Sequence, residues 1–455
     1  MPLPVYMEGP AFMPVGPTDL KGWVSYLKSV LGPVLAAYNS TQSDVEAVLS
    51  VPGIDSAHDQ MAVLPLVQGG NQLDLRTRTA PALSLEPLLK TTNWDPATFI
   101  PGLVDAVKWN DQLIGVPYMY SPMAIWVDIA DWQALGIPLP SPQWTSQQFT
   151  STCALLHAAL GRSKSVLGRG LYRFPAPQVW TGWVWGHGGR LVDPDGRIVL
   201  TDAGARSGVG ALANAIRAAV PDMCAQTGEM GFTYGGHWAS TPAVGSTKVG
   251  LAAYPVMPFG RAVPTEVWGL GIPAGYPHAN LAAAFLFWLS GPGGQAEMVA
   301  AGYPTVLAHG SLGSAQWVTS TPPGVDLGGL DPPASALRPI PWQVQLLSGL
   351  LELAIWQSLD AVSDEELAQL LFNTEQECNA CLALPAEQQQ TYLGQKLQPF
   401  FRPGVGKTPQ ASSGSVSCFL PAFSLPSRYA TATLGLAAAK VQSHVSRESS
   451  DVGPP

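Results

Sequence analysis

The sequence predicts a mixed α/β protein. Helical and strand-like apolar patterns alternate along most of the 455 residues, and 46% of the residues are hydrophobic, which is enough to bury a core. Only 12% of the residues are charged, against the usual ~25%. The length corresponds to two or three domain-sized units, and the sequence contains no visible internal repeat.

The first part of the chain mixes helix and strand. Apolar residues at helical spacing predict a helix over 23–39, and alternating apolar residues predict a strand over 44–51. A short helix with a glycine stop is expected over 59–70, and another helix across 98–107. This alternation favours the α/β class.

The stretch GVPYMYSPMAIWVD, residues 115–128, fits no simple element. It is strand-like, but Pro117 and Pro122 each remove a donor that a central strand needs. A solvent-exposed loop would not favour so many large apolar side chains, Tyr120 and Trp126 among them. Its role has to come from its place in the whole fold.

Further helices are expected along the rest of the chain. Thr145 and Gln148 form a capping-box pair, which predicts the start of a helix that runs to about residue 160. A second extended run with prolines, LAAYPVMP, covers residues 251–258. The other expected helices cover residues 128–137, 202–220, 279–290, 293–301, 343–359 and 364–384, with a strand over 268–274.

The charge balance excludes a nucleic-acid surface. The net charge is −9, and no run of Lys and Arg is present to neutralise phosphates. No apolar stretch approaches the ~20 residues that span a bilayer. The N-terminal MPLPVYMEGP lacks the pattern of a signal peptide, so we expect a chain that is either cytoplasmic or given without its leader.

No catalytic or metal-binding motif is complete. Cys378 and Cys381 form a CxxC inside an expected helix, without the second pair that a zinc site needs. The stretch GVGKT, residues 404–408, lacks the earlier glycine of a phosphate-binding loop. Asp193 and Asp195 fit a turn better than a pair of glycosidase carboxylates. We therefore expect no metal, no cofactor and no catalytic residue.

Two histidines, His187 and His237, stand beside glycine pairs in HGG and GGH. One interpretation is a pair of ligand-binding groups. The more common arrangement is a turn histidine that hydrogen-bonds a backbone carbonyl, and we expect this arrangement for both.

Aromatic residues gather at expected strand ends and glycine-rich turns instead of helix interiors. For any single tryptophan, a place at the margin of the core is the simpler interpretation. An aromatic cleft with few charges, however, suits a neutral polyol, whose C–H faces stack on rings. The residues in question are Tyr118, Tyr120, Trp126, Trp180, Trp183, Trp185, Trp238, Trp268 and Tyr303.

Four stretches, in the expected order, carry a resemblance to a known family. They are LAAYNSTQSDVEAVLSVPG with LPLVQGGNQLDL, LSLEPLL with FIPGLVDAVKWNDQLIGVPYMYSPMAIWVDIADWQALGIPLPSPQWTSQQF, GEMGFTYGGHWAS, and WGLGIPAGYPHANLAAAFLFWLSGPGGQAEMVAAGYPTV. The second and fourth are long and specific. Together they resemble the extracellular solute-binding proteins of ATP-binding-cassette (ABC) sugar importers, of the maltose/glycerol-phosphate-binding type, over roughly residues 35–400.

The resemblance implies a two-lobe periplasmic-binding-protein fold of type II, with three hinge crossings between the lobes. The runs 115–128 and 251–258 would be the first two crossings, and the third would follow Pro304. In the first crossing, the prolines would limit the run to short-range pairing. Lobe 1 would then contain residues 1–117 and 255–308, lobe 2 residues 118–254 and 309–401, and residues 402–455 would be a disordered tail.

The resemblance also implies ligand-binding residues. Tyr120 and Ser121 are at positions where the first crossing of the family meets the sugar. Trp238 matches the stacking tryptophan of the family's glycine turn, so Trp238→Ala should weaken sugar binding by ~1–3 kcal/mol.

Five further candidates come from looser parts of the same match. Trp180 and Trp183 compete for an aromatic position before the GG turn. Glu8 follows the first strand, where its carboxylate would accept hydrogen bonds from sugar hydroxyls. Trp268 and Tyr303 are candidates from the late strand of lobe 1 and the final crossing.

The function that the resemblance implies is capture of a sugar or oligosaccharide between the lobes and delivery to an ABC permease. Such a protein is not an enzyme, and we expect a monomer that works in the periplasm or outside the cell, associated with the cell surface. A secreted glycosidase-like enzyme with an aromatic sugar cleft is the alternative. A sensor protein that reports its ligand to a signalling partner is a third possibility.

Overall fold

The computed structural model describes residues 1–5, 20–50, 62–67, 82–90, 92, 94–109, 111–160, 177–219, 232–236, 249–301, 305–308 and 332–398. The chain forms two compact units, Met1–Leu393 and Gly394–Pro455. The elements below belong to the first unit, apart from the end of the last helix. The predicted tail, 402–455, and the GVGKT stretch lie outside the described residues.

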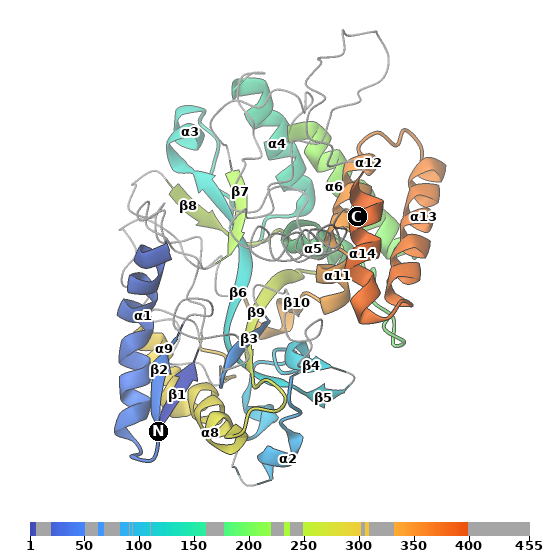
Figure 1. Ribbon diagram of the computed structural model, residues 1–455. Helices are drawn as coiled ribbons and strands as arrows, with labels where there is room; N and C mark the ends of the chain where they lie inside the picture. The colour runs from blue at the N-terminus through green and yellow to red at the C-terminus, as the bar shows by residue number, and fades with distance from the viewer. Residues whose placement is uncertain are drawn as a thin grey trace, which may run out of the picture. The chain divides into compact units, whose positions relative to one another are not determined.

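The N-terminal elements agree in part with the sequence. Strand β1 (Pro2–Val5) pairs in parallel with β2 (Glu46–Leu49), and α1 (Leu20–Ser40) contacts β2. These elements confirm the predicted helix over 23–39 and the strand over 44–51. Figure 1 shows them beside α8 (Ala279–Ser290) and α9 (Pro292–Ala300), which confirm the helices expected at 279–290 and 293–301.

Two predicted helices in this part of the chain are wrong. Residues Leu64–Val67, within the helix expected over 59–70, form strand β3, which pairs antiparallel with β9 (Val263–Gly271). A proline at position 65 is costly inside a helix, and the apolar run gains a partner strand instead. The helix expected across 98–107 is reduced to the single turns η2 (Pro96–Thr98) and η3 (Asp105–Val107), separated by Gly102 at φ 86°.

Short elements complete this region. Helix α2 (Glu86–Leu89) precedes the two single turns, and β4 (Lys108–Trp109) pairs with β5 (Gln112–Leu113) in a small hairpin. Asp111, in the turn of this hairpin, has a φ of 61°, a left-handed conformation that Asp tolerates better than most side chains.

The 115–128 stretch is one continuous strand, β6 (Gly115–Asp128). Its residues up to Pro122 pair antiparallel with β9, and its residues from Met123 pair antiparallel with β7 (Phe232–Gly236) and, from Ile125, with β8 (Val249–Ala252). Figure 1 shows β6 running from β9 up to β7 and β8. Besides β6 and β3, β9 also pairs with β10 (Leu337–Pro339), in parallel.

The expectation that prolines limit this stretch to short-range pairing is wrong, and their positions explain why. The register of β6 against β9 shifts between Pro117 and Met119, which marks a bulge. Pro122 is the last residue that pairs with β9 before the partner strand changes. Proline is tolerated in a sheet at bulges and at places where a ladder partner is missing. Each proline therefore lies where its missing donor costs least.

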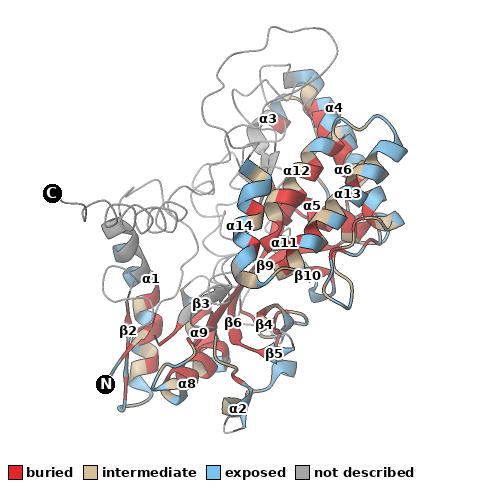
Figure 2. Ribbon diagram, turned by 45° about the vertical axis from the view of Figure 1, so that its right-hand side comes forward, coloured by how far each residue is buried: buried red, intermediate tan, exposed pale blue. Residues whose placement is uncertain are grey.

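Of the remaining helices, α3 (Ile129–Ala134) contacts strands β6 and β8, and most of the others pack against one another. The others are α4 (Ser146–Leu160), α5 (Pro177–Gly186), α6 (Ala203–Ala219), α11 (Trp342–Leu346), α12 (Ser348–Ser358), α13 (Asp364–Leu382) and α14 (Ala386–Leu397). Helix α6 contacts α4, α5, α12 and α13, and α5 also contacts β9. Figure 2 shows α4, α6 and α13 with buried inner faces and exposed outer faces, the pattern of amphipathic helices.

In these helices the predicted capping box is confirmed, whereas one predicted helix is divided in two. Thr145 and Gln148 exchange hydrogen bonds between side chain and backbone, at 2.8 and 3.2 Å, as a capping box does. The single helix expected over 343–359 is instead broken at Leu347 into α11 and α12.

Helix α5 corrects the prediction that the aromatic residues avoid helix interiors. Trp180, Trp183 and Trp185 all lie inside it. The helix packs closely because Gly182 faces Tyr254: a Cβ at this glycine would lie 2.6 Å from the tyrosine hydroxyl. The tryptophans reflect a helix buried on nearly every side, which a search for amphipathic periodicity does not detect.

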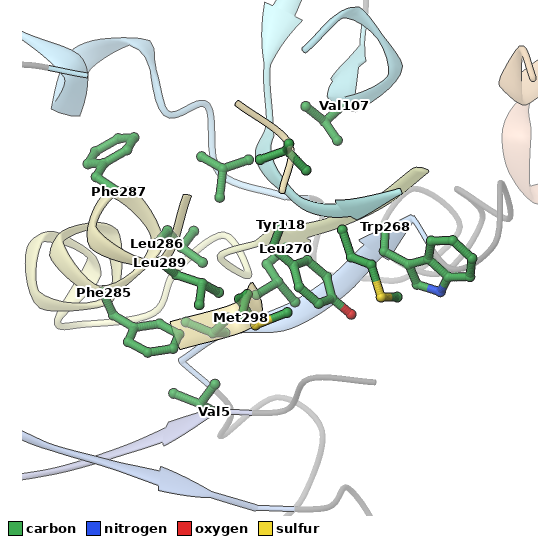
Figure 3. Close-up of a cluster of buried hydrophobic side chains, with 14 of the residues drawn as sticks. Val5, Val107, Tyr118, Trp268, Leu270, Phe285, Leu286, Phe287, Leu289 and Met298 are labelled. Carbon is green, nitrogen blue, oxygen red and sulfur yellow. The ribbon is translucent and has the colours of Figure 1, made fainter. Parts of the chain in front are cut away.

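The core is continuous around β6 and β9. Figure 3 shows part of it, where Tyr118 and Leu270 lie next to Leu286, Leu289 and Met298. The β9 residues are all buried, so this strand is covered on both faces. Within the described parts of the chain, no helix is both long and apolar enough to cross a bilayer.

Candidate functional site

The partner change in β6 fixes the position of two predicted site residues. Tyr120 and Ser121 are opposite Val267 and Glu266 of β9. Met123, two residues after Ser121, is already opposite Gly236 of β7. Both predicted residues therefore lie immediately before the point where the strand leaves one set of partners and joins the other.

The register also shows which side chains share a face of the β6–β9 ribbon. Directly opposite residues on antiparallel strands point to the same face, with Cβ atoms about 4.5–5.5 Å apart. Ser121 therefore shares a face with Glu266, whereas Tyr120 points to the opposite face. Ser121 is 2% exposed, and Tyr120 is partly buried and packs against the hydrophobic core.

A buried polar cluster gathers around Ser121. The amide Nε2 of Gln178, on α5, donates a hydrogen bond of 2.8 Å to Oε1 of Glu266. Glu266 is 1% exposed and Gln178 is 7% exposed. We call Ser121, Glu266 and Gln178 the ribbon polar cluster. It joins β6, β9 and α5, three elements that lie far apart in the sequence.

Sequence reasoning missed Glu266 and Gln178. The available signal was a single charged residue inside the otherwise uncharged run VPTEVWGLG. A carboxylate in such a run must find hydrogen-bond partners or pay a large desolvation cost, so it points to a special environment. Gln178 had no comparable signal, because only the tertiary packing of α5 on β9 reveals its partner.

Trp180 lies on α5 but apart from this cluster. It is 1% exposed, and its indole Nε1 is buried without a hydrogen-bond partner among the described residues. Residues two apart on a helix are about 200° apart around its axis, so Trp180 and Gln178 point to different sides. The structure does not bring Trp180 together with Ser121.

Trp183 lies in the core between helices. Its ring contacts Phe149 of α4 edge-on at 5.6 Å and stacks on His187 at 6.3 Å between centroids. The His187 ring nitrogen Nδ1 lies 2.7 Å from the carbonyl oxygen of Trp183, which confirms the turn histidine predicted from the sequence. The contacts and the 1% exposure of Trp183 indicate a packing role.

Trp268 is also part of the core. It is 7% exposed, lies opposite Met119 and belongs to the hydrophobic cluster around β6 and β9. Figure 3 shows its indole on the far side of that cluster from Phe285 and Phe287. The remaining predicted residues, Glu8, Trp238 and Tyr303, lie outside the described residues, as does His237.

The cysteines do not form a metal site in the described structure. Cys378 and Cys381 lie on α13, as predicted, and both are buried with free thiols. Burial raises the pKa of Cys381 to about 11 and also raises the pKa of Cys378, so both thiols are protonated at neutral pH. Among the described residues, no group of three His, Cys, Asp or Glu side chains could hold a metal ion.

One described pocket lies apart from the ribbon polar cluster. Its volume is about 540 Å³, and Trp94, Phe99 and Phe287 form part of its wall. The indole Nε1 of Trp94 donates to Ser290 Oγ at 2.9 Å, and Ser290 Oγ in turn donates to the Leu286 carbonyl at 3.0 Å. None of the predicted site residues that the structure describes lines this pocket.

Comparison with solved structures identifies the fold. The chain is similar to an ABC substrate-binding protein from Listeria monocytogenes in complex with cycloalternan, at 12% identity and TM-score 0.63, covering 84% of this chain and 99% of that chain. It is similar to the sugar-binding protein MalE from Xanthomonas citri, at 14% identity and TM-score 0.63, with coverage of 89% and 100%. UgpB from Mycobacterium tuberculosis, in complex with glycerophosphocholine, matches at 16% identity and TM-score 0.59, with coverage of 87% and 99%.

These structures confirm the predicted fold, the two-lobe α/β fold of type II periplasmic binding proteins. Among curated proteins, none is significantly similar to this chain in sequence. The family of bacterial extracellular solute-binding proteins, however, matches residues 27–296, which is more than half of the chain. Membership implies a location in the periplasm or outside the cell, and it confirms the resemblance seen in the sequence. The chain belongs to the bacterial extracellular solute-binding protein family.

Proposed function

We propose that this protein captures a sugar or oligosaccharide between its two lobes and delivers it to the permease of an ABC importer. The observation that carries the proposal is the course of β6. One strand pairs with β9 up to Pro122 and with β7 and β8 beyond it, so a single strand joins two sets of elements. Tyr120 and Ser121 lie at that junction.

The family and the fold support a binding role. Solved proteins of this fold hold cycloalternan and glycerophosphocholine, and one is described as a sugar-binding protein. The low charge and abundant tryptophan of this chain favour a neutral, polyhydroxyl ligand over an ionic one. In this proposal lobe 1 contains residues 1–117 and 255–308, lobe 2 contains residues 118–254 and 309–401, and closure occurs about the crossings.

The proposed ligand contacts combine residues predicted from the sequence with residues that only the structure reveals. Tyr120 and Ser121 come from the crossing, and Glu266 and Gln178 extend the ribbon polar cluster. Glu8, Trp238 and Tyr303 remain candidates from the family match, and Trp180, Trp183 and Trp268 are further aromatic candidates. Packing is the alternative role for these three tryptophans, because all of them are buried.

A ligand screen tests the proposal directly. Thermal-shift measurements with mono- and oligosaccharides should raise the melting temperature, because a ligand at 100 times its Kd adds about 2.7 kcal/mol to the unfolding free energy. Calorimetry on the positive ligands then gives the Kd. If no saccharide binds at millimolar concentration, the carbohydrate proposal is wrong.

Trp238→Ala tests the aromatic contact. The variant should bind the saccharide more weakly by ~1–3 kcal/mol, because a stacking ring with its buried area is lost. Phe259→Ala is the matched control, since Phe259 is an aromatic residue that is 78% exposed and should not affect binding. Equal Kd values for Trp238→Ala and the unaltered chain would assign Trp238 to packing.

The proposal includes the absence of catalysis and a monomeric state. Incubation with the bound oligosaccharide should release no new reducing ends, whereas a glycosidase would produce them. Light scattering should give the mass of one chain, and no binding to nucleic acid is expected at a net charge of −9. Co-purification with permease subunits from the cell surface, or with a signalling protein, separates import from sensing.

A further inference from the structure

The pocket beside α8 has aromatic walls. The Trp94 ring is tilted against Phe99 at 4.9 Å and against Phe287 at 5.9 Å between centroids, and all three residues line the pocket. Figure 3 shows Phe287 on the opposite side of α8 from Phe285. An apolar cavity of about 150 Å³ is enough to hold benzene in a protein interior, so the 540 Å³ of this pocket accommodates two fused rings.

The segment 305–308 forms another wall of the pocket. Phe99 and Leu307 form an antiparallel β-bridge, so their side chains share a face. Thr305 lies two residues before Leu307 and shares that face, whereas Val306 between them belongs to the hydrophobic core. The alternation therefore directs Thr305 and Leu307 into the pocket.

The hydroxyl groups around the pocket differ in one respect. Those of Thr92, Thr98 and Ser290 donate to backbone carbonyls at 3.0, 2.7 and 3.0 Å. Thr305 is 4% exposed, and its Oγ1 accepts from the Leu307 N–H at 3.2 Å, but its O–H donates to no acceptor among the described residues. A buried donor without an acceptor costs free energy, which an oxygen atom of a molecule in the pocket would recover.

We propose that this pocket is a second binding site, separate from the sugar site, for a neutral two-ring aromatic compound with one oxygen acceptor, such as an aryl alcohol. The rings pack among Trp94, Phe99 and Phe287. The oxygen accepts a hydrogen bond from Thr305. The inference does not depend on the proposed function.

Other ligand classes fit this pocket poorly. A saccharide carries many hydroxyls, and most of the hydroxyl donors that line the pocket are already bonded to the backbone. An anion would lose its water against the aromatic walls without compensation, and the Asp95 carboxylate also lines the pocket. A neutral, mainly apolar molecule avoids both costs.

2-Naphthol is the probe for this site. Calorimetry on the full chain should show one molecule bound per chain with a Kd below about 1 mM, the strength that a well-packed ligand of this size reaches. 2-Naphthoate has the same rings but a negative charge, and it should bind at least about 10-fold more weakly. No binding of 2-naphthol, or equal Kd values for the two compounds, would overturn the inference.

Thr98→Trp tests the location. Thr98 is exposed and lines the pocket, so the larger ring should occupy the space and weaken 2-naphthol binding by at least about 10-fold. Ala97→Trp is the matched control, because Ala97 is exposed on the same turn and does not line the pocket. Its Kd should stay within a factor of about two of the unaltered chain. Equal Kd values for the two variants would place the probe elsewhere and contradict the inference.

Thr305→Val tests the hydrogen bond while keeping the shape of the side chain. The variant should weaken 2-naphthol binding by roughly 3- to 10-fold, the loss of one hydrogen bond, and should leave the Kd of naphthalene unchanged because naphthalene has no oxygen. Comparing the two compounds on the same variant removes any effect on folding. Equal losses for both would contradict the role of Thr305 as the donor.

Competition separates this site from the proposed sugar site. 2-Naphthol should bind with the same Kd when a saccharide that is positive in the ligand screen is present in excess. Displacement of 2-naphthol by that saccharide would mean that the two share one site, which overturns the inference. If no saccharide binds, the proposed function fails, whereas this inference is decided by the 2-naphthol measurements alone.

Discussion

Single side chains join distant segments of this protein, and Gln295 is the best example. It is fully buried, and its Nε2 donates to the carbonyl oxygens of Tyr118 and Leu289 at 3.2 and 3.1 Å. Its Oε1 accepts from the Val306 backbone N–H at 2.8 Å. One amide therefore satisfies backbone groups of β6, α8 and the 305–308 segment, which cannot bond to water where they lie.

Gln295→Ala should destabilise the protein by about 2–4 kcal/mol, because several buried backbone groups lose their partner at once. Denaturant unfolding measures the change. Gln369→Ala is the control, since Gln369 is exposed and, among the described residues, bonds to Asn373 on its own helix, so its loss should cost less than about 0.5 kcal/mol. Similar losses in both variants would contradict this account.

Glu352, on α12, makes stability depend on pH. Burial raises the pKa of its carboxyl from 4.5 to about 8. The folded state therefore binds more protons than the unfolded state between about pH 4.5 and 8, so this group lowers stability as the pH rises through that window. Below about pH 4.5 the carboxyl is protonated in both states and contributes no such penalty.

Glu352→Gln should raise the unfolding free energy at pH 8 by about 1–3 kcal/mol, the scale of an uncompensated buried polar group. The gain should shrink as the pH falls towards 5. Thermal melts of both proteins between pH 5 and 8.5 measure it. A gain that is the same at every pH would mean that ionisation of Glu352 is not the cause.

At the scale of elements, helix α6 depends on glycine for its close contact with α5. A Cβ at Gly208 would lie 2.6 Å from the Trp183 carbonyl oxygen and 2.6 Å from the Val184 Cα. Both are backbone atoms, which cannot move without shifting the whole helix. Gly210, two residues later on α6, has only the Leu367 side chain at 3.5 Å.

Gly208→Ala should therefore destabilise the protein by more than about 2 kcal/mol, through overpacking of α5 against α6. Gly210→Ala should instead stabilise it by roughly 0.5–1 kcal/mol, since alanine favours helix more than glycine does. Denaturant midpoints measure both effects. The prediction fails if the two variants change stability in the same direction.

Side chains of helix α13 form hydrogen bonds with the backbone of residues 198–201. Asn379 donates to the Ile198 carbonyl at 3.0 Å and accepts from the Ile198 backbone N–H at 2.8 Å. Glu375 Oε2 accepts from the backbone N–H groups of Leu200 and Thr201 in the same segment. The backbone of Ile198, Leu200 and Thr201 thus bonds to side chains of a helix, while the Val199 N–H donates to the Leu191 carbonyl.

At the scale of the molecule, β6 is the strand on which the sheet depends. It pairs with β9 in its first part and with β7 and β8 in its second, and β9 in turn pairs with β3 and β10. Bending between two lobes would concentrate where the β6 partner changes, because fewer ladder bonds resist it there. That point is next to the ribbon polar cluster.

A chain that ends at residue 401 should keep the melting temperature and the saccharide affinity of the full chain. The first compact unit ends at Leu393, and the sequence predicts a tail without stable packing after residue 401. Thermal melts and calorimetry of the shortened and full chains provide the comparison. A drop of more than about 4 °C in melting temperature would show that the tail contributes to the fold.

Long, patterned elements and local caps were predictable from the sequence. The helix at 279–290 and the Thr145–Gln148 capping box depend on residues a few positions apart, so local physics decides them. The 59–70 and 98–107 predictions failed because pairing with β9 and a positive φ at Gly102 decide those segments. The aromatic helix α5 was missed because burial on nearly every side removes the amphipathic pattern.

Some residues of the candidate site were also predictable from the sequence, and others were not. Tyr120 and Ser121 were predicted from the family motif, and both lie on β6 next to the point where its partner strand changes. Glu266 and Gln178 were missed because they are 88 residues apart, and only packing of α5 against β9 brings them to 2.8 Å. Trp183 and Trp268 remain untested candidates with rings in the core, since a tryptophan in a sequence does not reveal whether its ring faces the core or a ligand.

By itself, the sequence determined the α/β class, the solute-binding family and the low-charge, aromatic character that suits a neutral ligand. These properties depend on composition, periodicity and motifs, all of which can be read from the sequence without a structure. Only the tertiary structure decided that two prolines lie within one continuous strand, and that a buried carboxylate lies opposite Ser121. Both depend on strand register, and register is set by long-range packing because a shift of one residue turns every side chain to the other face.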